Sequence, residues 1–137
     1  ADPSPRVRRL AAECLTLHRR EAAEADRVFA ALAAADTDRP LDHALTRLLM
    51  EGVERDGVAK GLAHPSPRVR RACLAALDQL PDGKLDPAAA LAELDSQDAA
   101  LRETAWWVAG RHPDGADRLA GYVQARLAGI EKLTPPE

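Results

Sequence analysis

A seven-residue string, Pro-Ser-Pro-Arg-Val-Arg-Arg, occurs twice in this chain, at residues 3–9 and again at residues 65–71. Self-similarity of this kind indicates repeated units that stack on one another, because a chain of such units buries its apolar residues between neighbours. The duplication constrains the fold more than any other feature of the sequence, and it says little about function.

The same apolar spacing recurs at two further places. Each stripe repeats at positions i, i+3, i+4, i+7 and i+8, which a helix presents on one face. The stripes are Val7, Leu10, Ala11, Cys14 and Leu15; Leu41, Ala44, Leu45, Leu48 and Leu49; Val69, Ala72, Cys73, Ala76 and Leu77; and Leu101, Thr104, Ala105, Val108 and Ala109. These anchor segments recur at intervals of about 30 residues. We expect each of them to form a helix that buries its stripe.

A second helix is expected in the gap that follows each anchor segment. Residues 20–35, 88–92 and 113–130 carry apolar stripes of their own. Residues 53–62 give the weakest pattern, because two glycines lower helix stability, so we expect a short helix there. Helix starts are marked by a capping side chain close to a proline, at Ser4-Pro5, Asp38 before Pro40, Ser66-Pro67 and Asp86-Pro87.

These patterns predict an all-α fold, with no strand pattern to compete. The arrangement we expect is a right-handed α-solenoid of about four antiparallel helix pairs in a single domain over residues 1–137. Its units are residues 1–35, 36–63, 64–94 and 95–131. Because residue 1 comes directly before a repeat helix, we expect the chain to be a segment of a longer protein.

Composition and charge argue against several classes of partner. The net charge is −3, which offers no general attraction to a phosphate backbone, so nucleic acid is not expected. The arginines of the duplicated string are interpreted as solvated residues or as contacts within the stack. No apolar run approaches the roughly 20 residues that cross a bilayer, so we expect a soluble protein without membrane contact.

Cysteines and histidines give no pattern for a metal, a cofactor or catalysis. Cys14 aligns with an alanine of the other copy, and Cys73 does too, so buried free thiols are expected ahead of a disulfide or ligand role. His18 and His43 lie apart from each other, and His64 precedes a helix in a loop. Because no acid, base and nucleophile stand in a recognisable arrangement, the sequence predicts a non-catalytic protein.

The stretch from Arg102 to His112 departs from the repeat. Both tryptophans of the chain, Trp106 and Trp107, occur there side by side, at positions that the other copies fill with residues such as Leu74. Since adjacent helical residues point about 100° apart, at most one can lie centrally in the apolar stripe. Packing is one interpretation. The other makes Arg102, Trp106, Trp107 and His112 the candidate interaction residues, because tryptophan and arginine are enriched among residues that dominate binding.

The segments DPSPRVRRLAAECL, HPSPRVRRACLAAL and SQDAALRETAWWVA together resemble HEAT repeats over nearly the whole chain. The period of about 30 is shorter than the usual HEAT unit of roughly 40, so short bacterial HEAT-like repeats are the better match. Ankyrin and tetratricopeptide repeats are disfavoured, since their signature residues are missing. Asp42 also departs from the pattern, because the other copies have an arginine there.

The runs RPLDHALTRLL, RRACLAALDQL and LRETAWWVAGRHPDGADRLAGY are similar to the HEAT segment of large exported bacterial proteins. Those proteins resemble membrane-bound dehydrogenases and carry a β-propeller and a c-type cytochrome domain. The present chain has neither propeller strands nor a haem motif, so the resemblance implies a spacer or docking module. It also implies an exported parent, in the periplasm or cell envelope.

The function expected from these observations is a scaffold that presents a curved helical surface to another protein or to flanking domains. Self-association through open ends of the solenoid is a further expectation. The alternative is a nucleic-acid-binding or base-excision protein like the HEAT-like alkylpurine DNA glycosylases, which place Trp and Asp residues in a basic groove. A bilin-lyase-like HEAT protein has no supporting residue beyond the fold.

Overall fold

A computed structural model describes residues 4–15, 23–34, 37–81 and 85–131, and these residues contain helices and no strand. The α-helices are α1 (Pro5–Leu15), α2 (Ala23–Ala33), α3 (Arg39–Gly52), α4 (Arg55–Lys60), α5 (Pro67–Gln79), α6 (Pro87–Leu91), α7 (Ala99–Arg111) and α8 (Ala116–Glu131). Two short 3₁₀ helices, η1 (Gly61–Ala63) and η2 (Pro113–Gly115), precede α5 and α8. The all-α fold expected from the sequence is confirmed, and so is the short helix expected within residues 53–62.

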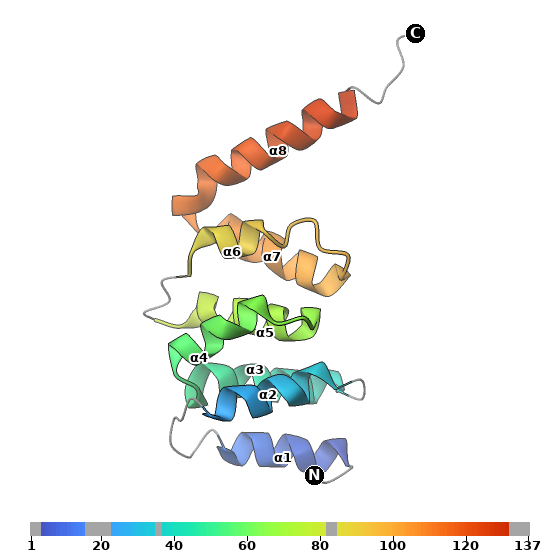
Figure 1. Ribbon diagram of the computed structural model, residues 1–137, viewed down its shortest axis with the longest axis vertical. Helices are drawn as coiled ribbons and strands as arrows, with labels where there is room; N and C mark the ends of the chain where they lie inside the picture. The colour runs from blue at the N-terminus through green and yellow to red at the C-terminus, as the bar shows by residue number, and fades with distance from the viewer. Residues whose placement is uncertain (1–3, 16–22, 35–36, 82–84, 132–137) are drawn as a thin grey trace.

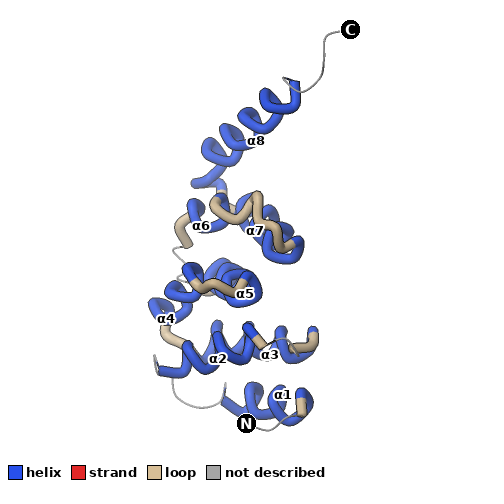
Figure 2. The backbone as a smooth tube through the Cα atoms, turned by 45° about the vertical axis from the view of Figure 1, so that its right-hand side comes forward, coloured by secondary structure: helices blue, strands red, loops and turns tan. Residues whose placement is uncertain are grey.

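The helices follow one another along the long axis of the molecule (Figure 1). The four that contain the anchor segments, α1, α3, α5 and α7, pack in that order, each against the next. A second layer lies beside them: α2 packs on α3, α4 and η1 pack on α5, and α6 packs on α7 (Figure 2). Each of these partner helices therefore lies on the anchor helix that follows it in the chain. The helix α8 packs on α7 and η2 and extends beyond the stack toward the C-terminus (Figure 1).

The helix starts follow the capping pattern for two of the predicted residues. Asp38 accepts a hydrogen bond from the Leu41 amide at 2.8 Å, and Asp86 accepts one from the Ala88 amide at 2.9 Å. Ser66 differs from the expectation, because its side chain makes no capping bond. Its amide instead donates to Nδ1 of His64 at 3.0 Å, which places His64 at the start of α5 as a loop residue.

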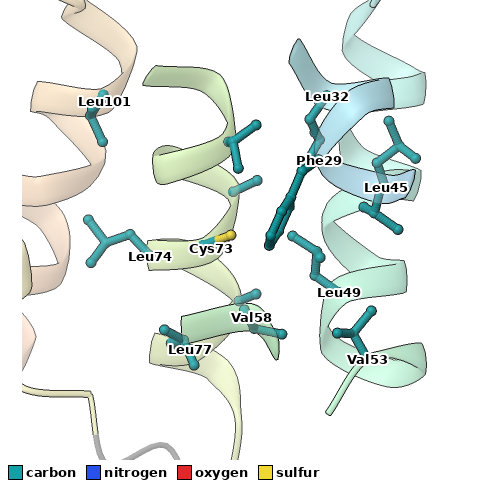
Figure 3. Close-up of a cluster of buried hydrophobic side chains, with 14 of the residues drawn as sticks. Phe29, Leu32, Leu45, Leu49, Val53, Val58, Cys73, Leu74, Leu77 and Leu101 are labelled. Atoms are coloured by element: carbon teal, nitrogen blue, oxygen red, sulfur yellow. The ribbon is translucent and has the colours of Figure 1, made fainter. Parts of the chain in front are cut away.

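The core is a continuous row of apolar side chains between neighbouring helices. Among the described residues no polar or charged residue is buried as a whole, although the side chain of Asp78 on α5 is 1% exposed. Figure 3 shows how α5 is covered from both sides: Cys73 points toward Phe29, and Leu74 points toward Leu101. All four of these side chains are buried. An anchor helix in the middle of the stack thus contacts the preceding and the following unit with two different faces.

The first three residues of the stripe on the first anchor helix are exposed, and for these residues the expectation from the sequence is wrong. Val7 is 44% exposed and Leu10 is 52% exposed, and Ala11 is exposed as well. The residues that align with the first two, Val69 and Ala72, are 0% and 2% exposed. The difference has a simple cause: α5 has α2 and α3 on that side, whereas the described residues place no helix on that side of α1.

The arginines of the second copy connect neighbouring units. Arg71 in α5 donates two hydrogen bonds to the carboxylate of Asp42 in α3, at 2.6 and 2.7 Å. Arg70 donates from Nε to Glu93, which lies after α6, at 2.7 Å. Charge-assisted bonds of this geometry are stronger than neutral ones, so they fix the register of α5 on both neighbours. They are contacts within the stack, as one of the two interpretations held.

Candidate interaction site

A cleft of about 700 Å³ lies between α7, α8 and the turn that follows α6. We call it the C-terminal cleft. It is lined by Leu94, Asp95, Gln97, Arg102, Trp106, Tyr122, Val123, Arg126 and Leu127. Two of the four candidate residues from the sequence, Arg102 and Trp106, therefore lie together in it.

Two aromatic rings form the apolar part of the C-terminal cleft. Trp106 is 40% exposed, and its ring meets that of Tyr122 edge-on, with centroids 5.9 Å apart and planes at 67°. Edge-to-face contact at this separation is a favourable arrangement for aromatic pairs. Leu127 lies in the same cleft and is 55% exposed. The helix contact thus holds Trp106 in place without covering it.

Charged groups surround the aromatic pair. Arg126 forms an ion pair with Asp95 at 2.8 Å, and its guanidinium lies 5.9 Å from the centre of the Tyr122 ring. Desolvation raises the pKa of Tyr122, and its hydrogen bond to Asp95 raises that pKa further. Arg102 donates to the Ser96 carbonyl at 2.6 Å and is otherwise exposed. The cleft offers a partner an apolar surface with two guanidinium groups at its edge.

Trp107 lies outside the C-terminal cleft. It is 47% exposed, and the guanidinium of Arg111, four residues further along α7, lies 4.4 Å from its ring centre. A cation placed over an aromatic face is attracted by the electron-rich ring. Trp107 and Arg111 therefore form a local pair on the surface of α7, and neither tryptophan belongs to the core.

His112, the fourth candidate, joins α7 to α5. Its Nε2 lies 2.7 Å from a carboxylate oxygen of Asp78, whose side chain is 1% exposed. Arg111 approaches the other carboxylate oxygen at 3.6 Å. A buried carboxylate needs such partners, because leaving it without them costs several kcal/mol, on the order of 3–5. The geometry gives His112 a role in packing and places it away from the C-terminal cleft.

The sequence interpretation did not single out Asp95, Tyr122, Arg126 or Leu127. Tyr122 is the only tyrosine of the chain, and Arg126 follows it at a spacing of four on the same helix. Residues at that spacing face the same side of a helix. This signal was present in the sequence, but it gave no indication that α8 would turn this side toward Trp106.

The described residues contain no group of three or more His, Cys, Asp or Glu side chains arranged to hold a metal ion. No described helix is long and apolar enough to cross a membrane. Cys73 is a buried free thiol, as expected, and burial raises its pKa to about 12. The structure describes the backbone of Cys14 and not its side chain, and His18 lies outside the described residues, so their predicted roles stay predictions.

Two further grooves lie along α3, α5 and α7. Both include Asp42, His43 and Arg71. The charges of Asp42 and Arg71 already satisfy each other across these grooves. They therefore offer a partner less unsatisfied chemistry than the C-terminal cleft does.

No protein-family model, curated protein or solved structure matches this chain. The resemblance to HEAT repeats stays a prediction.

Proposed function

We propose that the chain is a HEAT-like α-solenoid that acts as a non-catalytic protein-binding scaffold, for a separate protein or for flanking domains of a parent chain. The stacked anchor helices with a partner layer beside them support this arrangement. Rigid stacked helices also favour binding physically, because a surface that is already ordered loses little conformational freedom when a partner docks.

The observation that carries the proposal is the chemistry of the C-terminal cleft. Exposed Trp106 and Leu127 supply apolar surface, and Arg102 supplies hydrogen-bond donors beside it. Tryptophan and arginine in a pocket are the residue types on which protein complexes most often depend. The partner that fits is an amphipathic helix, and an acidic residue beside its apolar stripe strengthens the contact by pairing with Arg102.

The repeat explains why a helix is the expected occupant. Trp106 aligns with Leu74, which points from α5 toward Leu101 of the next anchor helix (Figure 3). Leu74 is 1% exposed, and it also lines a small pocket with Ala89 of α6. The C-terminal cleft thus lies where a further anchor helix would stack on α7.

Selection of binders from a library of helical peptides tests this proposal. Peptides selected on the wild-type chain should carry an apolar stripe and acidic residues, and Trp106→Ala should weaken their binding about tenfold, roughly 1.4 kcal/mol. Trp107→Ala is the matched control, since Trp107 lies on another side of α7, and it should leave the affinity nearly unchanged. Selected peptides that bind both variants as tightly as the wild type would contradict a binding site in the cleft.

Nucleic acid is the second candidate, and the observation that favours it is that two arginines and two aromatic rings share one cleft. Stacking on aromatic rings and phosphate contacts to arginine are the usual means of binding single strands. The Arg126–Asp95 ion pair opposes it by neutralising one of the two charges. A gel shift with duplex and single-stranded DNA that weakens steeply as salt rises would favour this candidate over a protein partner.

A further inference from the structure

The exposed large apolar side chains of the described residues gather at the two ends of the stack. Val7 and Leu10 lie on α1 at one end, and Trp106, Trp107 and Leu127 lie on α7 and α8 at the other. The large apolar residues of the helices between them are covered by neighbouring units. Each end therefore has the kind of surface that the inner units bury.

The last described helix, α8, resembles a partner helix of the inner units. Ala-Asp-Arg followed by a branched apolar residue occurs at 25–28 in α2 and again at 116–119 in α8. In α2 both apolar residues of this string, Ala25 and Val28, are buried against the stack. In α8 the counterparts are Ala116, which is exposed, and Leu119, which is half-buried.

At the N-terminal end, the helix α1 presents the outward apolar stripe of an anchor helix. The helix α1 repeats the Pro-Arg-Val-Arg-Arg sequence with which α5 begins, and its outward stripe aligns with the residues of α5 that α2 and α3 cover. Among the described residues, the cleft beside α7 and α8 holds no anchor helix, and the outer face of the anchor helix α1 is uncovered.

We propose that the chain associates head to tail with a second copy of itself, α1 of one copy occupying the C-terminal cleft of the other. This inference rests on the proposed function, since it names the occupant of the same cleft. The outer stripe of α1, with Val7 and Leu10, then covers Trp106 and Leu127 as α7 covers α5 within the chain. Two different surfaces meet in such a contact, so each added copy leaves the same two ends open and the assembly grows with concentration.

One residue pair limits the strength of this contact. Within the chain, Arg71 of α5 binds Asp42 of α3. The equivalent step between copies places Arg9 opposite Arg102, because Arg9 aligns with Arg71 and Arg102 aligns with Asp42. Like charges oppose association, so Arg102→Asp should restore the inner pairing and tighten the contact about tenfold.

Sedimentation velocity with two single variants tests the head-to-tail arrangement. The wild-type chain should form species that grow as its concentration rises toward about 1 mM, because even a contact with a dissociation constant of about 1 mM forms at that concentration. Leu10→Glu and Leu127→Glu each place a charge on one end only, at a side chain exposed in the free chain, so each variant should stay folded and monomeric. A 1:1 mixture of the two should form a dimer and nothing larger, because only one competent contact remains.

Ala30→Glu is the control, since Ala30 is exposed on α2 and lies neither on α1 nor in the C-terminal cleft, and it should associate like the wild type. Circular dichroism of all variants verifies that they are folded. A wild-type chain that stays monomeric overturns the inference, and so does a mixture that stays monomeric. If only one of the two glutamate variants loses association, two identical ends pair with each other, and the head-to-tail arrangement is overturned.

The outcomes separate this inference from the proposed function. A monomeric wild-type chain whose cleft still binds selected helical peptides removes self-association and leaves the scaffold proposal standing. A chain that binds neither peptides nor a second copy at the C-terminal cleft removes both the self-association and the scaffold proposal.

Discussion

Gly61 shows how closely the units approach one another. It lies in η1 against the centre of α5, and a Cβ atom there would overlap Sγ of Cys73 and lie 2.7 Å from Cζ of Phe29. Both neighbours are buried and have no room to withdraw. The glycine appears in the sequence as a residue that weakens a helix, but its function in the fold is to let η1 approach α5.

Replacing Gly61 with alanine should therefore lower the free energy of unfolding by about 1–3 kcal/mol through overpacking. Alanine has the higher helix propensity by about 1 kcal/mol, so propensity alone predicts the opposite sign. Gly110→Ala is the matched control, because nothing lies within 4 Å of a Cβ built there, and it should raise stability by up to about 1 kcal/mol. Urea denaturation measures both variants, and a stabilised Gly61→Ala would contradict the close packing.

The buried thiol of Cys73 predicts a pH dependence of stability. Burial raises its pKa from 9.0 to about 12, so the folded state holds the proton after the unfolded state has released it. The stability contributed by the thiol is complete below pH 9 and decreases as the pH rises toward 12.

The comparison that isolates this contribution is between Cys14→Ala and Cys14→Ala with Cys73→Ala, each unfolded in urea at a series of pH values. The difference in unfolding free energy between the two should be constant below about pH 9 and should shrink above it. A difference that does not change with pH would mean that Cys73 ionises in the folded chain as it does in the unfolded one.

At the scale of the elements, the link between α3 and α5 depends on one ion pair. Arg71 and Asp42 are partly buried, with side chains 27% and 21% exposed, and two hydrogen bonds join them. Arg47 and Glu51 form another pair at 2.8 Å, but both belong to α3 and are 69% and 44% exposed. The two pairs differ mainly in burial and in whether they connect different helices.

A double-mutant cycle of Arg71→Ala and Asp42→Ala should give a coupling energy of about 1–3 kcal/mol, the range for hydrogen bonds to charged groups. The same cycle on Arg47 and Glu51 should give less than about 0.5 kcal/mol, as exposed pairs on one helix do. Urea denaturation of the single and double variants supplies both values. Equal coupling in the two cycles would show that the Arg71–Asp42 pair does not hold the units together.

The helices were the part of the fold that the sequence predicted best, because their apolar spacing and their capping residues are local. Whether a stripe is buried depends on helices from other parts of the chain, and the local sequence does not determine it. Val7 begins a stripe just as Val69 does, and only the neighbouring helices decide that one is exposed and the other buried. The same reason explains the candidate site: Trp106 was found by its departure from the repeat, whereas Tyr122 and Arg126 join it only through the way α8 packs on α7.

At the scale of the whole molecule, apolar side chains are exposed at both ends of the described stack. The inner units satisfy one another, and the exposed apolar residues and the C-terminal cleft remain where the next unit would lie. We propose that this cleft receives a helix that covers Trp106, whether the helix comes from a second copy or from another protein.

Acrylamide quenching of Trp106 fluorescence measures this directly, in a Trp107→Phe variant that leaves Trp106 as the only tryptophan. The account predicts that quenching decreases as the protein concentration rises, and that it decreases at low concentration when a selected helical peptide is added. Adding Leu10→Glu should remove the concentration dependence and keep the response to peptide. Quenching that stays constant while sedimentation shows association, and while peptides bind, would contradict the claim that the cleft is the binding site.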